Sequence, residues 1–283
     1  MEQAGFLNME YQKITGWQKH PELSRLKDLT TPPKEIYFIG KWDPKIFKNC
    51  VAVIGSRRMT EYGQRVLEKI IPQLVCQGQT IISGFMYGVD QYAHQVCLEN
   101  GGKTIAILGW GINFKLENYD LKLAQKVIRS GGLLLSEWEN QQPSVWTFPS
   151  RNRLVAALAK EVIIIEAADK SGSLITAKIA TKLKRKVWAV PGPITSRLSA
   201  GTNKLIALGQ ANIWLGNFPT SRAESVNKSN SLINLLENNV LTANEIARKL
   251  GKPVSQIGAQ LSLMSLAGQL IEKEGKYYLN NVG

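Results

Sequence analysis

The chain has 283 residues, of which 44% are hydrophobic and 20% are charged. These proportions are ordinary for a globular protein, and the sequence contains no internal repeat and no low-complexity segment. No apolar run approaches the ~18 residues that a membrane-spanning helix needs, so we expect no membrane partner.

Lys and Arg outnumber Asp and Glu by 35 to 22, which gives a formal net charge of +13. The excess is concentrated between residues 142 and 220, where 11 Lys and Arg stand against 3 Asp and Glu. Positive charge gathered beside turn motifs favours a polyanionic partner. The alternative is a basic surface that faces only solvent.

The cysteines and histidines are too few and too scattered for a familiar metal site. Cys50, Cys76 and Cys97 form no Cys-x-x-Cys pair, and neither His20 nor His94 completes a zinc motif with them. We therefore expect free thiols, no metal and no cofactor. The N-terminus lacks a basic start followed by an apolar run, which indicates no signal peptide and a cytoplasmic protein.

Residues 1–48 are expected to form a short, irregular lead-in segment with one strand-like run, Ile36–Gly40. From 49 to 216, short apolar runs alternate with helical patterns. Strands are predicted at VAVIG, TIISG, KTIAILG, GLLLSE, VIIIEA and KVWAVPG. Continuous apolar strands alternating with helices are typical of a parallel sheet covered on both faces, so we predict an α/β domain.

The C-terminal part of the chain has a different pattern. Residues 217–231 are polar and predict a linker. Residues 232–283 follow the order helix, helix, turn, helix, β-hairpin, which is typical of a winged-helix domain. Within it, Thr242 and Glu245 have the spacing of a capping box. The helix predicted at 254–267 contains no Lys or Arg and is a poor reader of a DNA groove.

The loop after the first strand of the α/β domain contains Gly55, Ser56 and Arg57. Gly55 allows a tight turn and close approach of a ligand, Ser56 and free N–H groups can bond phosphate oxygens, and Arg57 can clamp a phosphate. One glycine does not make the dinucleotide fingerprint Gly-x-Gly-x-x-Gly. The alternative is an ordinary strand-to-helix turn with surface arginines.

Two further strands end in glycine-rich loops. One loop carries Ser83, Gly84 and Gly88, and the other runs from Leu108 to Asn113. Because the carboxyl ends of parallel strands meet at one edge of a sheet, these exits favour a shared crevice.

Two later helix starts carry candidate binding residues. The first combines Phe148 with Arg151, Asn152 and Arg153, and the second is the run Lys170, Ser171, Gly172 and Ser173. A stacking ring beside guanidinium groups is typical of single-strand binding, and a helix N-terminus attracts phosphate. The alternative for Phe148 is a core position beside a capped helix.

Groups suited to catalysis are few. Glu137 and Glu166 each end a strand without an obvious nucleophile beside them, and His94 has no credible triad. Structural or ligand-orienting roles are favoured for them, and we expect a protein that is not an enzyme.

Seven spaced motifs within residues 20–215 resemble the DNA-processing protein A family, also called Smf. They are VAVIGSR, SGFMYGVD, LGWGIN, SEWENQQPSVWTFPSRNR, EAADKSGSLITAKIA, VWAVPG and GTNKLIALG. The resemblance implies an extended Rossmann-like, mostly parallel sheet with helices on both faces. It implies a homodimer that binds single-stranded DNA and loads the recombinase RecA in natural transformation or recombination, with no catalytic step.

By motif position, the resemblance implies a DNA site lined by Gly55, Ser56, Arg57, Ser83, Gly84, Gly88, Phe148, Arg151, Asn152, Arg153, Lys170, Ser171, Gly172 and Ser173. The second loop departs from the family pattern. Family members usually have a small residue, then Ala and a basic residue, where this chain has Phe85, Met86 and Tyr87. The departure predicts a pocket of different shape.

Two other functions are compatible with the same elements. A nucleotide-binding Rossmann-like sensor or a nucleoside-monophosphate hydrolase would share the fold, but such hydrolases carry a Pro-Gly-Gly-x-Gly-Thr-x-x-Glu run that does not occur here. A transcription regulator would read duplex DNA with the winged helix, and the helix without Lys or Arg argues against it.

Overall fold

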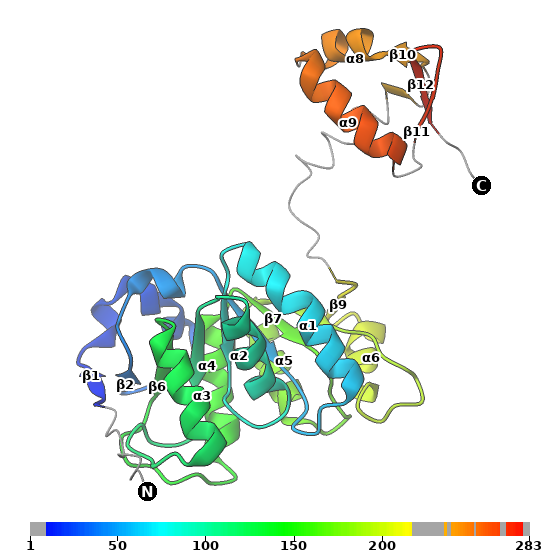
Figure 1. Ribbon diagram of the computed structural model, residues 1–283. Helices are drawn as coiled ribbons and strands as arrows, with labels where there is room; N and C mark the ends of the chain where they lie inside the picture. Colours follow the sequence, from blue (N-terminus) through cyan, green and yellow to red (C-terminus); the bar gives the residue numbers. More distant parts are fainter. Residues whose placement is uncertain (1–9, 217–234, 237–238, 252, 267–269, 280–283) are drawn as a thin grey trace, which may run out of the picture. The chain divides into compact units, whose positions relative to one another are not determined.

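The apolar runs of the chain form one nine-stranded sheet in the order β1-β2-β6-β5-β4-β3-β7-β8-β9 (Figure 1). The computed structural model describes residues 10–216, 235–236, 239–251, 253–266 and 270–279. The strands are β1 (Gln12–Ile14), β2 (Ile36–Ile39), β3 (Cys50–Ile54), β4 (Thr80–Ser83), β5 (Thr104–Ile107), β6 (Leu133–Ser136), β7 (Glu161–Ile164), β8 (Lys186–Ala189) and β9 (Asn212–Ile213).

The sheet is parallel from β6 to β9, and only its β1–β2 end is antiparallel. β3 lies at its centre, with β4 on one side and β7 on the other, and every residue of β3 is buried. β2 pairs antiparallel with both β6 and β1. The predicted Rossmann-like, mostly parallel sheet is confirmed. The strand-like run expected at 36–40 forms β2 and is buried as part of the sheet. The rest of the lead-in was expected to be irregular, but it also supplies β1, which pairs with β2.

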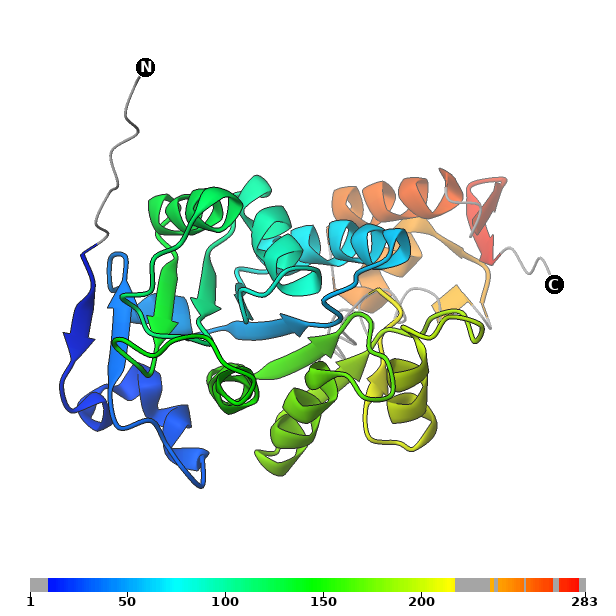
Figure 2. The ribbon, with the colours of Figure 1, turned by 90° about the horizontal axis from the view of Figure 1, so that it is seen from below.

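Helices cover both faces of the sheet, as predicted (Figure 2). α1, α2 and α3 lie on one face, and α4, α5 and α6 lie on the other. The helices are α1 (Glu61–Cys76), α2 (Val89–Glu99), α3 (Asn118–Arg129), α4 (Thr147–Leu158), α5 (Gly172–Lys182) and α6 (Ala200–Ala207), with short 3-10 helices η1 (Trp17–Lys19), η2 (Pro21–Asp28) and η3 (Pro44–Phe47).

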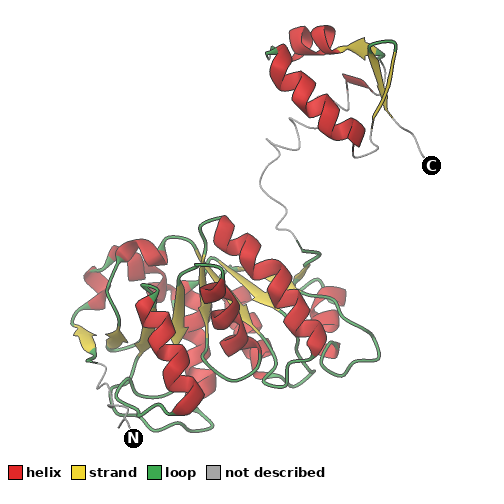
Figure 3. Cartoon of the chain, viewed as in Figure 1, coloured by secondary structure: helices red, strands yellow, loops and turns green. Residues whose placement is uncertain are grey.

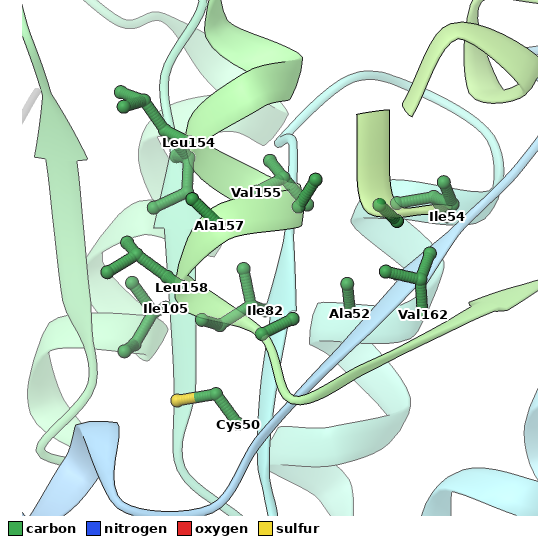
Figure 4. Packing of buried hydrophobic residues seen from close by; sticks show 14 of the residues in the cluster. Cys50, Ala52, Ile54, Ile82, Ile105, Leu154, Val155, Ala157, Leu158 and Val162 are labelled. Atoms are coloured by element: carbon green, nitrogen blue, oxygen red, sulfur yellow. The ribbon is translucent and has the colours of Figure 1, made fainter. Parts of the chain in front are cut away.

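The main core lies between the sheet and α4 (Figure 4). All residues of α4 from 154 to 158 are buried, and they pack over Ala52, Ile82 and Ile105 of three neighbouring strands. Alternate strand residues point to the opposite face, where Ala106 and Leu134 contact α3 in a second cluster. Both faces of the sheet are therefore buried under helices, and the loops that follow the parallel strands lie along its carboxyl edge.

A second compact unit begins after residue 217 (Figure 3). It contains α8 (Ala243–Leu250), α9 (Val254–Leu266) and a three-stranded sheet of β10 (Leu241–Thr242), β12 (Lys276–Leu279) and β11 (Leu270–Lys273). The predicted capping box at the start of α8 is confirmed. The predicted linker, 217–231, and most of the helix predicted at 232–237 lie outside the described residues, so the winged helix stays a prediction.

Within the described ranges, no helix has both the length and the apolar character to cross a lipid bilayer. The same ranges hold no group of three or more His, Cys, Asp or Glu placed to bind a metal ion. The cysteines are free thiols, with Cys50 and Cys97 buried and Cys76 exposed. Burial raises the pKa of both buried thiols to about 12, so they remain protonated and serve as core residues.

Candidate nucleic-acid interface

A cavity of about 770 Å³ opens at the carboxyl edge of the large sheet. Its walls come from the loops after β3, β4, β7 and β8 and from the start of α4. Of the residues expected to line a DNA site, it gathers Gly55, Ser56, Arg57, Gly84, Phe148, Arg151, Asn152, Lys170, Ser171, Gly172 and Ser173. Residues more than 100 positions apart in sequence thus meet in one hollow.

The loop after β3 brings two cations to the cavity. A Cβ on Gly55 would lie 2.7 Å from Cγ2 of Val89 and 3.0 Å from the carbonyl oxygen of Glu166, so the tight passage requires glycine. The Ser56 hydroxyl accepts a hydrogen bond from the backbone N–H of Arg58 at 3.0 Å, which shapes the turn. Arg57 and Arg58 both project into solvent beside the cavity.

Arg151 lies at the base of the cavity rather than on its surface. It is 2% exposed, and its guanidinium donates to the carbonyl oxygens of Gly84 and Ile107, which follow β4 and end β5. Asp90 faces it, and burial raises the pKa of this carboxyl while burial lowers the pKa of Arg151 to about 10. Arg151 therefore braces two loop exits, with few N–H donors left for a ligand.

Three of the expected site residues lie outside the cavity lining. Ser83 is fully buried and donates its hydroxyl to the carbonyl oxygen of Val53 at 2.6 Å. Gly88 supports the neighbouring loop through close backbone packing. Arg153 is not part of the lining and forms a bidentate ion pair with Glu137, in which Nη1 and Nη2 each lie 2.6 Å from a carboxylate oxygen. These residues shape the region without facing the cavity.

The start of α5 presents backbone donors to the cavity. Ser171 caps the helix by accepting from the N–H of Ser173 at 3.3 Å, and their hydroxyls lie 2.7 Å apart. Asn152 reaches across from α4, with its amide nitrogen 3.4 Å from the carbonyl oxygen of Gly172. Because a helix N-terminus carries a partial positive charge, this corner suits an anion, with the exposed Lys170 beside it.

Phe148 supplies the aromatic wall of the site. The ring is half-buried, packs edge-on against Trp110 at 6.2 Å between centroids, and fills the space beside Gly109. The Arg57 guanidinium carbon lies 4.9 Å from the ring centroid. A rigid ring next to an exposed cation is an arrangement that can receive a base and its phosphate together.

The cavity also has residues that the sequence did not single out for binding. Arg58, Tyr87 and Arg197 are exposed and line it, and the partly buried Asp90 also belongs to the lining. Arg197 follows β8 at the same sheet edge, so the rule that parallel strands share a carboxyl edge could have identified it. Tyr87 follows β4 at this edge and was singled out only as a change in the shape of the pocket, because the exposure of its ring depends on how the second loop folds.

The N-terminus of α1 is occupied by the protein itself. The buried carboxylate of Glu166 accepts from the backbone N–H of Thr60 at 2.9 Å and from the Thr60 hydroxyl. This is the position at which a Rossmann-like fold commonly binds a phosphate at its first helix. Because Glu166 already takes this position, a ligand phosphate would bind to other groups of the cavity. The role found for Glu166 is that of an internal cap.

The charges of the lining suit a polyanion. Arg57, Arg58, Lys170 and Arg197 are exposed cations, while the lining carboxylate Asp169 lies 3.6 Å from Lys204. The second lining carboxylate, Asp90, lies against Arg151. Both carboxylates thus have cationic partners within the protein, and the chemistry that the lining offers is capture of phosphate and stacking of bases.

Known proteins with related sequences and folds share this architecture. The sequence model of the family described as DNA recombination-mediator protein A matches residues 14–221. Protein Smf of Escherichia coli (strain K12) is 33% identical over 249 residues, which cover 80% of this chain and 67% of that protein.

Two solved structures are similar in fold and sequence. The X-ray structure of DNA processing protein A from Streptococcus pneumoniae matches with a TM-score of 0.64 and 34% identity, over 72% of this chain and 71% of that one. A structure of DNA processing protein A from Helicobacter pylori, described for its unique single-stranded DNA binding mode, matches with a TM-score of 0.64 and 31% identity, over 80% and 97%.

Proposed function

Since the chain belongs to the DNA recombination-mediator protein A family, we propose that it binds single-stranded DNA in the cavity at the carboxyl edge of its large sheet. Exposed cations and helix N-termini capture the phosphates, and a base stacks beside Phe148. Because these groups contact backbone phosphates and ring faces, binding is largely independent of base sequence and falls with salt.

The observation that carries the proposal is the meeting of Arg57, the Phe148 ring and the α5 N-terminus around one open cavity. The Helicobacter pylori relative supports it, because the description of that structure names a single-stranded DNA binding mode and this chain covers 97% of that protein. Duplex DNA fits the site less well, since paired bases cannot stack on a ring.

We further propose that the protein acts without catalysis. The alternative is a nucleotide-binding sensor or a nucleoside-monophosphate hydrolase with a Rossmann-like fold. The Glu166 carboxylate argues against this alternative, because it bonds the N-terminus of α1, where such folds usually bind a phosphate. Chromatography of nucleoside monophosphates incubated with the protein tests this proposal, and release of free base would overturn it.

The family membership also supports finer proposals about partners. We propose that the protein forms a homodimer in the cytoplasm and loads the recombinase RecA onto the bound strand during recombination or natural transformation. Light scattering coupled to gel filtration would measure the dimer. An assay of RecA assembly on strands coated with single-strand binding protein would measure loading, and an unchanged RecA rate would contradict it.

The decisive experiment is fluorescence anisotropy with labelled oligonucleotides across a salt series. We expect Arg57→Ala to weaken single-strand binding by about 10- to 100-fold, as for removal of a charge-assisted hydrogen bond. The slope of log K against log salt should become shallower by about 0.7 for each phosphate that the variant no longer binds. Duplex of the same length should bind more weakly in the same buffer.

The matched control is Arg65→Ala, which removes an exposed arginine that pairs with Glu61 on α1, outside the cavity lining. It should leave the affinity within about twofold. Equal weakening in the two variants would mean that only net charge matters. A preference for duplex DNA, or no effect of Arg57→Ala, would contradict the proposed site.

A further inference from the structure

Arg57 is an exposed cation whose direction is set by aromatic rings and not by a carboxylate. In the described parts of the chain, no ion pair involves Arg57. Its guanidinium carbon lies 4.9 Å from the ring centroid of Phe148 and 5.7 Å from that of Tyr87. Both distances are within the ~6 Å over which a cation is attracted to a ring face.

The two rings come from different elements and differ in burial. Phe148 belongs to α4 and is anchored against Trp110, so the fold itself requires this ring. Tyr87 lies in the loop between β4 and α2 and is 56% exposed. Because the Tyr87 ring contributes little to the core, its contact with Arg57 is not a by-product of core packing.

The loop that carries Tyr87 is joined to the loop that carries Arg57. The backbone N–H of Val89 donates to the carbonyl oxygen of Ser56 at 3.1 Å. At Gly88, a Cβ would lie 2.6 Å from the carbonyl oxygen of Arg57, so the two backbones touch. These backbone contacts therefore fix the loop that carries Tyr87 next to the loop that carries Arg57, within reach of the contact between ring and guanidinium.

A contact with a ring face leaves the hydrogen-bond donors of Arg57 free. The guanidinium has five N–H donors, and attraction to an aromatic face consumes none of them. Arg153 shows the contrast, because its ion pair with Glu137 occupies donors on both terminal nitrogens. Two rings can thus restrict the rotamers of a long, flexible side chain without taking up the N–H groups that bind phosphate.

From these contacts we infer that Tyr87 is a positioning residue, which together with Phe148 holds the Arg57 guanidinium ready for a DNA phosphate. The inference rests on the proposed function, since it names a further residue of the same site. Tyr87 acts through Arg57, and the order imposed before binding lowers the entropic cost of binding. A ring that acts by stacking on a base would behave differently, and the two cases can be separated.

The test is a double-mutant cycle in the full chain, with anisotropy of a labelled oligothymidylate as readout. We expect Tyr87→Ala to weaken binding by about fivefold, as for removal of one exposed cation–ring interaction. In the Arg57→Ala background, Tyr87→Ala should weaken binding by less than about twofold, because the guanidinium that the ring positions is absent. Tyr87→Phe, which keeps the ring, should bind like the unaltered protein.

A second measurement needs no DNA. The ¹⁵N relaxation of the Arg57 Nε–H bond, assigned by the disappearance of its signal in Arg57→Ala, reports the order of this side chain. Its order parameter should fall in Tyr87→Ala and stay unchanged in Tyr119→Ala, the matched control. Tyr119 is 51% exposed on α3, and its hydroxyl donates to Gln95 away from the cavity.

Equal weakening by Tyr87→Ala with and without Arg57 would overturn the inference and indicate direct stacking on a base. An Arg57 order parameter that Tyr87→Ala leaves unchanged would also overturn it. Failure of the unaltered protein to bind single strands would instead refute the proposed function. The relaxation measurement would then still decide whether Tyr87 holds the guanidinium.

Discussion

Arg151 and Arg153 are two positions apart on α4, and their surroundings give them different roles. Arg151 is buried and bonds the carbonyl oxygens of two strand-exit loops. Arg153 pairs with Glu137 and also donates to the carbonyl oxygen of Thr31 at 3.0 Å. Both guanidinium groups are largely committed to the protein, so the exposed arginines of the cavity are the ones available for DNA.

His94 is a fully buried histidine on α2 whose protonation the fold opposes. Its Nδ1 lies 2.6 Å from the hydroxyl of Thr104, and burial, assisted by the charge of Arg151, lowers its pKa to about 3. The unfolded chain binds a proton at this side chain near pH 6.5, whereas the folded chain does not until about pH 3. The free energy of unfolding must therefore decrease as the pH falls through this interval.

Replacing the histidine should remove this contribution. Between pH 7 and pH 4.5, we expect the unfolding free energy of the unaltered protein to decrease by about 2–3 kcal/mol more than that of His94→Gln. Urea denaturation at the two pH values, followed by tryptophan fluorescence, measures the difference. Parallel decreases in the two proteins would show that His94 does not titrate in this way.

At the scale of elements, the loops after the parallel strands depend on one another. Gly88, at the start of α2, has φ 84° and ψ −134°, a conformation essentially limited to glycine. A Cβ at this position would also meet the backbone of Ser56 and Arg57. The β4–α2 loop and the β3–α1 loop are therefore one structural unit of the cavity.

Gly88→Ala should separate these two loops. We expect it to lower the unfolding free energy by more than about 2 kcal/mol and to weaken single-strand binding, because Arg57 is displaced. The control is Gly101→Ala, which also has a positive φ, of 70°, but has no atom within 4 Å of the added Cβ. It should cost only about 1–2 kcal/mol and leave binding unchanged. Identical behaviour of the two variants would disprove the coupling of the loops.

At the scale of the whole molecule, the candidate site belongs to one of two compact units. Every residue that lines the cavity lies between 54 and 200, within the unit that ends at residue 217. The second unit has its own core around Ile246, Ile257 and Leu261. Each unit therefore buries its own apolar side chains.

This division predicts that a fragment of residues 1–217 binds single-stranded DNA with an affinity within about threefold of the full chain. The reason is that the phosphate-binding groups and Phe148 are all retained, and small affinity changes of this size are below about 1 kcal/mol. Anisotropy with the same labelled oligonucleotide measures both proteins. A decrease of more than about tenfold would assign part of the binding to the second unit.

Local sequence patterns were sufficient to identify most strands and helices of the large unit. The run that forms β3 is continuously apolar, and β4 and β5 were identified from the apolar residues Ile81, Ile82 and Ile105–Ile107. Such signals are local, because periodicity and capping depend on neighbouring residues. The carboxyl edge as a place for a binding site followed from the same alternation, since parallel strands all end there.

Which side chains face the cavity depended instead on tertiary contacts. The short edge strands β1 and β9 left no pattern in the sequence, since two or three residues cannot show an alternation. The pairing of Thr60 with Glu166 spans 106 positions, and the contact of Arg57 with Tyr87 and Phe148 joins three loops or helix starts. The partner of a polar side chain is set by which distant segments pack beside it, and neighbouring residues in the sequence carry no information about that packing.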